Sequence, residues 1–512
     1  MSTATADGSD DNLRARGQQS PLASQRAKQS NTPSEANRTG RISGYFPLGY
    51  KEGFSQWTGK EAPSETPSTA SFSDSSSNKA MPVRTQSNSD PYGPRQWHSK
   101  LVQLSGKNRA LNEFSVERTD EDIDQNLVML HGYGAGLGFF YKNFEGLSRV
   151  KGWKIYALDM LGMGRSSRPP FKLDSKDRQQ CITEAESWFI DALEEWRVQK
   201  KIDRFTLLGH SLGGYMAVAY ALKYPGHLKK LVLASPVGIP EDPYAVNADM
   251  PEPSESTMTN EFSQDQQADV KKTSNTNLPD STKSRGDRNN FLNTGPKSRN
   301  TNGTNEKPAP RKPLPKWLTY LWDANISPFS IVRWSGPLGP RFVSGWTSRR
   351  FSHLGSEEAR ALHTYAYTLF KQRGSGEYAL AYILAPGAFA RSPLIRRIQG
   401  VGRQYLRPDG SVTSSIESGA RKRENGIPVV MMYGENDWMD VAGGYAAEQK
   451  LKEEKVKTLA KASAEERKEE NGSAKVIVIK KAGHHVYLDG WEEFNEVMRQ
   501  EMEDVSKHEN RL

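Results

Sequence analysis

The sequence predicts an α/β protein in which a mostly parallel sheet carries helices on both faces. Short apolar runs of strand length alternate with longer stretches of helical spacing, for example Trp153 to Leu158 before the amphipathic stretch Lys176 to Lys200. Strands that alternate with helices are typical of parallel sheets covered on both sides. Several of the runs also end in glycine-rich turns, such as the turn that begins at His131.

The expected elements follow one another in order along the chain. An antiparallel hairpin comes first, because alternating runs at 101–104 and 111–116 flank a short turn that contains Gly106. The expected buried strands are 127–130, 153–158, 205–208, 231–234, 428–433 and 475–479. The expected helices are 176–200, 357–371, 377–384, 448–470 and 491–505.

The composition indicates one large folded domain surrounded by polar chain. Only 35% of the 512 residues are hydrophobic and the mean hydropathy is −0.75, yet the polar residues concentrate in a few segments. The net charge of +9 favours acidic partners such as anionic lipid, and no recognition motif supports a nucleic-acid partner. Because Cys181 is the only cysteine, a disulfide within the chain and a cysteine-based zinc site are excluded. We expect neither a metal nor a cofactor.

These patterns divide the chain into five parts. We expect 1–95 to be a mostly disordered tail, although the aromatic residues of 42–57 predict an arm that docks on the folded body or on a membrane surface. The folded core is expected in two pieces, 96–239 and 421–512, with a charged surface insertion near 448–472. Between them lie a polar, disordered insertion at 240–312 and an aromatic-rich helical cap at 313–420, which follows the sixth expected strand. No apolar run reaches the length of about 20 residues that spans a bilayer, so a membrane would be met peripherally.

The stretch Phe205 to Tyr215 reads as a strand, a very tight turn and a helix around Gly209-His210-Ser211-Leu212-Gly213. This is the G-x-S-x-G nucleophile elbow, which presents a serine hydroxyl on a strained turn. The flanking strand and helix are the context that the motif requires. Ser211 is therefore the candidate nucleophile.

A serine hydroxyl is a weak nucleophile unless an adjacent base accepts its proton. Asp437 follows one expected strand and His484 follows the last one, so a parallel sheet would bring both to the edge that carries Ser211. The order serine, acid, histidine is that of the α/β-hydrolase triad. His484 would act as the base and Asp437 would orient its ring. The competing acids are Glu435 and Asp440, and the competing base is His485.

The attacked carbonyl also needs donors for its developing negative charge. The backbone N–H of Leu212 would supply one, and the N–H of Tyr133 in the loop His131-Gly132-Tyr133-Gly134 would supply the other. A glycine-rich loop can also cradle phosphate, but no complete phosphate-binding motif is present here. The segment Asp159 to Ser167 reads as structural turn chemistry.

The motifs resemble those of the α/β-hydrolase subfamily that holds the fungal cardiolipin-specific deacylases, the animal lipid-droplet lipase coactivator and its N-acyl-phospholipid lipase relative. The matching stretches are HGYGAGLGFFYKNFEGL from His131, LDMLGMGRSSRP from Leu158, GHSLGGY from Gly209, SPVGIP from Ser235, YGENDWMD from Tyr433 and GHHVYLD from Gly483. The resemblance implies that Ser211, Asp437 and His484 form the triad of a serine phospholipase. It also implies a phospholipid substrate, with cardiolipin the narrowest expectation, and a peripheral, mitochondrial membrane location, with the cytoplasm or lipid droplets as alternatives.

Two other functions remain open at the level of the sequence. His484 and Asp489 match the H-x-x-x-x-D pattern from which lysophospholipid acyltransferase activity has been proposed in this subfamily. The coactivator branch lacks the serine nucleophile, and its example raises a non-catalytic, lipase-binding role. Because this chain has Ser211, catalysis is the preferred expectation. In the cap, Arg391, Arg396 and Arg397 are candidates for contact with anionic headgroups.

Overall fold

The protein is described by a computed structural model that covers residues 50–58, 83–84, 93–241, 326–385, 389–406 and 422–509. Residues 1–47 form one unit of the chain and 48–512 form another, and the first unit lies outside the described residues. The expected disordered insertion at 240–312, apart from residues 240 and 241, and most of the expected tail also lie outside them. Everything below concerns the second unit.

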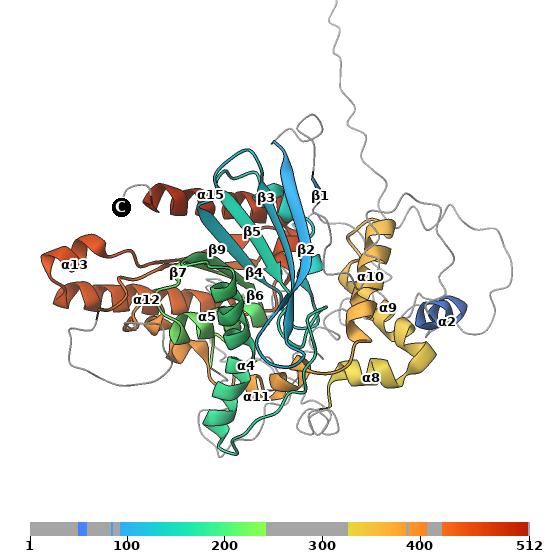
Figure 1. Ribbon diagram of the computed structural model, residues 1–512. Helices are drawn as coiled ribbons and strands as arrows, with labels where there is room; N and C mark the ends of the chain where they lie inside the picture. The colour runs from blue at the N-terminus through green and yellow to red at the C-terminus, as the bar shows by residue number, and fades with distance from the viewer. Residues whose placement is uncertain are drawn as a thin grey trace, which may run out of the picture. The chain divides into compact units, whose positions relative to one another are not determined.

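One sheet organises the described part of the chain, with the strand order β1-β2-β3-β5-β4-β6-β7-β8-β9 (Figure 1). Its strands are β1 (Val83–Arg84), β2 (Arg95–Gln103), β3 (Ala110–Arg118), β4 (Gln125–Leu130), β5 (Trp153–Leu158), β6 (Phe205–His210), β7 (Leu228–Ala234), β8 (Pro428–Gly434) and β9 (Ser473–Ile479). β1, β2 and β3 pair antiparallel, as β3 and β5 also do, whereas β5-β4-β6-β7-β8-β9 pair parallel. The predicted hairpin, buried strands and mostly parallel sheet are confirmed.

The strand residues alternate between two hydrophobic clusters, one on each face of the sheet. In β6, Leu207 belongs to the cluster that includes Trp196 and Tyr215, whereas Leu208 belongs to the cluster that includes Phe494. This alternation is the period of two expected of a strand. Because both faces are covered, all residues of β6 are buried, which explains why the neighbouring Leu207 and Leu208 are both apolar.

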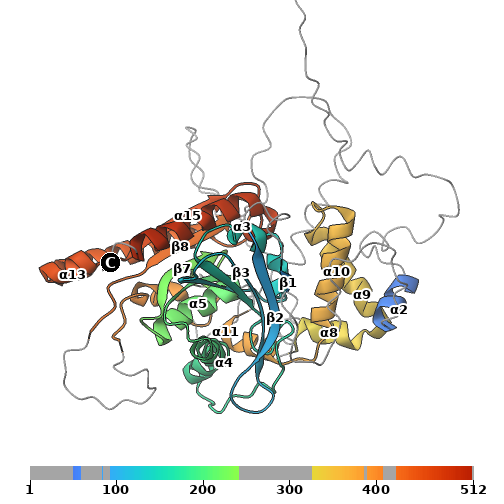
Figure 2. The same ribbon diagram turned by 45° about the horizontal axis from the view of Figure 1, so that its top comes forward.

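Helices cover the sheet on both sides. On one face lie α4 (Arg178–Gln199) and α5 (Leu212–Lys223), and on the other lies α15 (Trp491–Glu509), which contacts α3 (Phe144–Leu147) and α14 (Val486–Asp489). Figure 2 shows the sheet between these two layers. The three-layer arrangement places the carboxyl ends of β6, β8 and β9 along one edge, where the following loops meet.

The long helix predicted at 448–470 is two helices, α12 (Val441–Lys461) and α13 (Ala464–Glu469). It begins earlier than predicted because the side chain of Asp440 accepts a hydrogen bond from Ala442 N at 2.9 Å and caps α12. It breaks at Ser463, whose side chain forms a reciprocal capping box with Glu466 and starts α13.

The cap lies between β7 and β8, directly after the expected strand 231–234 as predicted; this strand is seventh rather than sixth because the two-residue β1 was not expected. Its elements are α8 (Pro328–Trp334), η4 (Gly336–Leu338), α9 (Gly339–Arg350), α10 (Ser356–Phe370), η5 (Gly376–Ala379), α11 (Leu380–Ile383), η6 (Leu394–Arg396) and η7 (Ile398–Gly400). The described end of the predicted arm, α2 (Tyr50–Thr58), packs on α9 and η4. Its Gln56 Oε1 lies 3.1 Å from His363 Nε2 of α10. No helix in the described ranges has the length and apolar character needed to cross a bilayer.

Candidate functional site

Ser211 occupies the turn between β6 and α5, with φ of +52° and ψ of −114°. A non-glycine residue in this region is strained and is held there by its surroundings. The surroundings are two close backbone contacts. A Cβ on Gly209 would lie 2.2 Å from Gly213 O, and a Cβ on Gly213 would lie 2.6 Å from Leu130 O. The two glycines of the motif are therefore needed for the β6–α5 turn to pack this tightly.

Asp437 and His484, which follow different strands, are brought together as the sequence predicts. His484 Nδ1 lies 3.0 Å from Asp437 Oδ1, and both side chains are buried. Asp437 Oδ1 also accepts a hydrogen bond from Met439 N at 3.0 Å, which fixes the carboxylate. The turns that carry the two residues touch, since a Cβ on Gly434 would lie 2.3 Å from Gly483 O.

The competing acids and base have other partners. Glu435 Oε2 accepts a hydrogen bond from Lys481 N at 2.8 Å, and Asp440 caps α12. His485 Nδ1 accepts a hydrogen bond from Arg350 Nε at 3.0 Å. Burial, and then the Arg350 cation, holds the pKa of His485 well below its usual value, so its ring is neutral and can accept. Asp437 and His484 are the acid and the histidine that contact each other.

His484 lies beside the elbow, in contact with His210. His210, the residue before Ser211, has its Nε2 3.1 Å from the backbone oxygen of His484, and the two rings are 4.8 Å apart between centroids. Since a carbonyl only accepts, His210 Nε2 carries the proton of this hydrogen bond. Burial, and then the neighbouring His484, keeps the pKa of His210 well below its usual value. A neutral His210 thus ties the nucleophile turn to the turn that carries His484.

The glycine-rich loop passes directly against Ser211. A Cβ on Gly132 would lie 2.8 Å from His210 Nδ1 and 3.0 Å from Ser211 Cβ, which is too close for a side chain and explains the glycine. This contact places the next residue, Tyr133, next to the elbow, while Leu212 is the first residue of α5. The N–H groups at a helix start have no partner within the helix and carry partial positive charge. The two predicted oxyanion donors therefore lie on segments that meet at Ser211.

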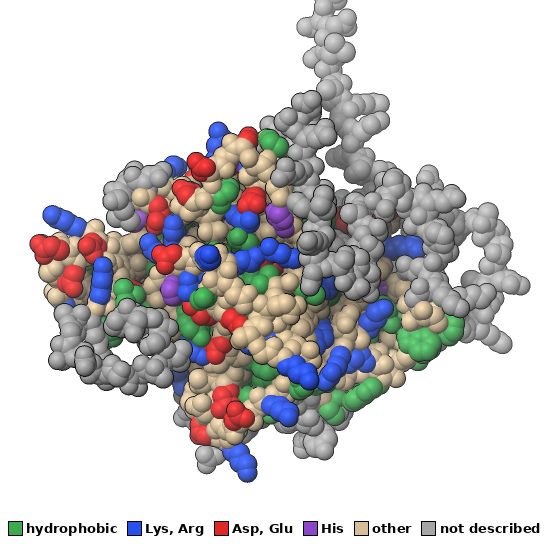
Figure 3. Space-filling view, viewed as in Figure 1, with side chains coloured by type: hydrophobic (Ala, Val, Ile, Leu, Met, Phe, Trp, Pro, Cys, Tyr) green, Lys and Arg blue, Asp and Glu red, His purple; other side chains and the backbone are tan. Residues whose placement is uncertain are grey.

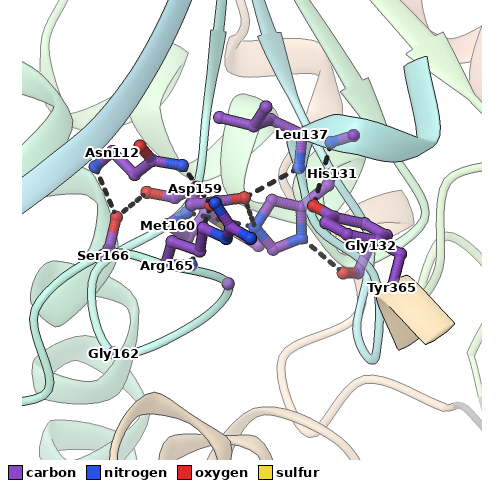
Figure 4. A network of polar contacts seen from close by, with 12 residues as sticks. Asn112, His131, Gly132, Leu137, Asp159, Met160, Gly162, Arg165, Ser166 and Tyr365 are labelled. Carbon is purple, nitrogen blue, oxygen red and sulfur yellow. Dashed lines mark hydrogen bonds and ion pairs between the residues drawn. The ribbon is translucent and has the colours of Figure 1, made fainter. Parts of the chain in front are cut away.

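A polar network around the buried Asp159 anchors this loop, as Figure 4 shows. Asp159 accepts hydrogen bonds from Leu137 N at 2.7 Å and from Arg165 N at 2.8 Å, and Asn112 Nδ2 donates to it at 2.8 Å. His131 completes the anchor, because its Nε2 accepts from Met160 N at 3.1 Å while its Nδ1 donates to Gly132 O at 2.7 Å. Burial lowers the pKa of His131 and keeps it in this neutral form.

The remaining predicted site residues have the following contacts. Arg397 donates to Glu186 Oε2 at 3.1 Å and to the hydroxyl of Tyr215 at 2.7 Å, so its charge is already compensated inside the protein. It is therefore a poor candidate for a headgroup ligand. Arg396 pairs with Glu241 at the surface, and Arg391 Nε donates to Ala381 O at 2.7 Å. Their role in headgroup binding stays a prediction.

Asp489, the second residue of the acyltransferase-like pattern, accepts a hydrogen bond from the backbone N of the neighbouring Gly483 at 3.1 Å. Arg350 of the cap contacts Asp489 as well as His485, and the sequence analysis missed this link, because nothing local predicts a contact across more than 130 residues. Among the described residues, no group of three or more His, Cys, Asp or Glu side chains is arranged to hold a metal ion.

The chain matches the family model for the alpha/beta hydrolase fold over residues 125–490. It is 30% identical over 369 residues to a 1-acylglycerol-3-phosphate O-acyltransferase of Arabidopsis thaliana, which covers 71% of this chain and 63% of that relative. It is 27% identical over 379 residues to the human 1-acylglycerol-3-phosphate O-acyltransferase ABHD5, covering 73% and 76%. It is 25% identical over 413 residues to the human (Lyso)-N-acylphosphatidylethanolamine lipase, covering 80% and 87%. Among solved structures, an esterase from Exiguobacterium antarcticum aligns with a TM-score of 0.43 at 15% identity, over 80% of this chain and 100% of that chain.

Replacing Gly164 with Ala tests the Asp159 anchor. Gly164 has a φ of +53°, and a Cβ there would lie 2.2 Å from Asp159 Cγ. We expect Gly164→Ala to lower the free energy of unfolding by about 3 kcal/mol or more, because backbone strain and a clash with a buried carboxylate combine. The measurement is denaturant unfolding followed by tryptophan fluorescence.

Gly336→Ala is the matched control for this prediction. Gly336 has a similar φ of +50°, but nothing lies within 4 Å of its added Cβ. It should therefore cost only the strain of a left-handed alanine, about 1 to 2 kcal/mol. Equal losses in the two variants would show that the Asp159 contact contributes nothing.

Proposed function

Because this chain belongs to the α/β-hydrolase family, we propose that it is a serine hydrolase that removes a fatty acid from an anionic phospholipid through an acyl-Ser211 intermediate. The observation that carries the proposal is the 3.0 Å contact of His484 Nδ1 with buried Asp437, next to a serine in the strained elbow conformation. A histidine that is oriented by an acid and lies beside a serine is the arrangement that activates a serine nucleophile.

In the proposed reaction, each proton transfer has a donor and an acceptor. Asp437 accepts a hydrogen bond from His484 Nδ1–H, which leaves Nε2 as the basic nitrogen. Nε2 takes the Ser211 hydroxyl proton as Oγ bonds to the ester carbonyl carbon. The same proton then passes to the leaving lysophospholipid alcohol as the carbon–oxygen ester bond breaks. Water repeats the sequence on the acyl-Ser211 ester, releases the fatty acid and restores the serine.

The oxyanion that forms at each step would be met by the N–H groups of Tyr133 and Leu212. Each donor of this kind contributes about 2.7 to 4 kcal/mol to lowering the barrier. The Asp159 network and the neutral His131 serve the same end, because they hold the loop 131–136 in place before substrate arrives. Positioning the donors in advance avoids reorganisation during the reaction.

Three observations support a phospholipid substrate. The relatives named above act, by their names, on acylglycerol phosphate and on N-acylphosphatidylethanolamine, and both are phosphate-bearing lipids. The whole chain carries a net charge of +9. The cap segment 326–385 has seven Arg and Lys against three Glu, a local charge of +4. Cardiolipin, which carries two phosphates, is the substrate that we propose within this class, and a mitochondrial membrane is the location that it would require.

An apolar face on the cap supports peripheral binding to an anionic membrane. The face is formed by exposed apolar residues on elements that contact one another. They are Phe54 and Trp57 of α2, Ile331 and Trp334 of α8, and Leu338 of η4. Figure 3 shows hydrophobic side chains in green over α2 and α8, with basic side chains in blue beside them. Aromatic and basic groups together suit a bilayer surface with anionic headgroups.

Helix α8, which carries part of this apolar face, also contacts the oxyanion loop. Phe329 of α8 stacks on Tyr133 with ring centroids 5.0 Å apart, so α8 lies between the apolar face and the oxyanion loop. A membrane bound at this face would therefore be separated from the oxyanion loop by α8.

A fluorophosphonate probe tests the nucleophile. We expect wild-type protein to be labelled at Ser211, whereas Ser211→Ala should lose labelling and should lower cardiolipin deacylation by at least about 1,000-fold. The readouts are mass spectrometry of the labelled peptide and of the released fatty acid. If folded wild-type protein is not labelled, the enzyme proposal fails and a non-catalytic, lipase-binding role becomes the better explanation.

Acyl transfer to a lysophospholipid is the second candidate, because the plant relative and ABHD5 are named acyltransferases. We expect free fatty acid from cardiolipin whether or not acyl-CoA and lysophosphatidic acid are present, because water can reach an acyl-serine. The products are followed by mass. Acyl incorporation into lysophosphatidic acid without release of fatty acid would overturn the hydrolase proposal.

Trp334→Ala tests whether the apolar face on the cap binds membranes. Trp334 is 73% exposed, and its loss should weaken binding to vesicles of phosphatidylcholine mixed with cardiolipin by about 10-fold, since an interfacial indole contributes on the order of 1.4 kcal/mol. Co-flotation with the vesicles measures this. Tyr445→Ala, which removes an aromatic of 53% exposure from α12, is the control and should bind as wild type does. An equal loss in both variants would exclude the cap face as the docking surface.

A further inference from the structure

We infer that Asp489 and Arg350 are positioning residues that fasten the cap to the turn carrying His484, so that the H-x-x-x-x-D pattern serves hydrolysis and not acyl transfer. The inference rests on the proposed function. Arg350 is the cap residue that takes part, and the triad by itself does not explain its contacts with His485 and Asp489.

Asp489 holds the backbone on the amino-terminal side of His484. Its Oδ2 accepts a hydrogen bond from Gly483 N at 3.1 Å, and its Oδ1 lies 3.4 Å from His353 Nε2 of the cap. The carboxylate is nearly buried, with 9% of the side chain exposed. Since His484 Nδ1 already has Asp437 as its partner, the imidazole does not need Asp489 as a second acid.

Arg350 holds the other side of His484. It is the last residue of α9, and its guanidinium donates from Nε to His485 Nδ1 at 3.0 Å, while Nη2 contacts the same nitrogen and lies 3.5 Å from Asp489 Oδ2. The neutral His485 in turn packs against Phe139, with ring centroids 5.9 Å apart. One cap side chain thus contacts the residue after His484 and the carboxylate that binds the residue before it.

The consequence is that His484 cannot shift without breaking contacts to the cap. Hydrogen bonds to charged groups are among the stronger ones in proteins, and the guanidinium fork fixes direction as well as distance. A displacement of about 1 Å in a catalytic group can lower a rate by about 100-fold. Asp489 and Arg350 therefore act through His484 and do not touch the substrate.

The experiment measures the rate constant of fluorophosphonate labelling at Ser211 in the full chain. We expect Asp489→Asn and Arg350→Gln each to lower it about 10- to 100-fold, and the double variant to lose no more than the worse single variant, because both changes break one unit. Arg350→Lys should recover part of the loss, since it keeps the charge but not the fork. The control is Arg360→Gln, which removes an exposed arginine of α10 and should label as wild type does.

Three results would overturn the inference. The first is unchanged labelling in Asp489→Asn, which is nearly isosteric and carries the test if Arg350→Gln does not fold. The second is losses that multiply in the double variant. The third is an Asp489→Asn protein that keeps fatty acid release but loses acyl incorporation into lysophosphatidic acid, since Asp489 would then be a transferase residue. Absence of labelling in wild-type protein is a separate outcome, which contradicts the proposed function itself.

Discussion

The close approach of backbone segments at the carboxyl edge of the sheet is the constraint on which the rest of the site depends. Gly209 lies against Gly213 across the elbow, and Gly434 lies against Gly483 between the turns after β8 and β9. Any side chain at these positions would push the segments apart. Ser211, Asp437 and His484 lie on these turns, so the distances between their side chains depend on how tightly the turns pack.

Two buried histidines and one buried aspartate extend that packing into a polar framework. Asp159 and His131 hold the glycine-rich loop, and His210 joins the elbow to the backbone of His484. All three side chains are buried and hydrogen-bonded, and burial lowers the pKa of both histidines, which keeps them neutral. The framework also reaches the cap, where the hydroxyl of Tyr365 accepts a hydrogen bond from Gly138 N at 3.0 Å.

The arginines of the cap illustrate why net charge alone says little about lipid binding. Arg333 pairs with Glu377 at 2.6 Å, Arg397 pairs with Glu186, and Arg350 is directed at His485 and Asp489. These cations hold the cap together or fasten it to the core. In the membrane binding that we propose, attraction for anionic lipid would come from other basic groups together with the exposed aromatic residues of α2 and α8.

The sequence by itself determined the parallel sheet, the presence and order of the strands from β2 to β9 and the three candidate triad residues, because each depends on a local pattern: an apolar run, a glycine turn, or a residue just past a strand end. Tertiary structure decided what local patterns cannot encode. It brought Asp437 into contact with His484, paired Arg397 with Glu186, and placed Asp489 in contact with Gly483 and Arg350. A charged side chain takes whichever partner the fold brings within reach, and that partner is often far away in the sequence.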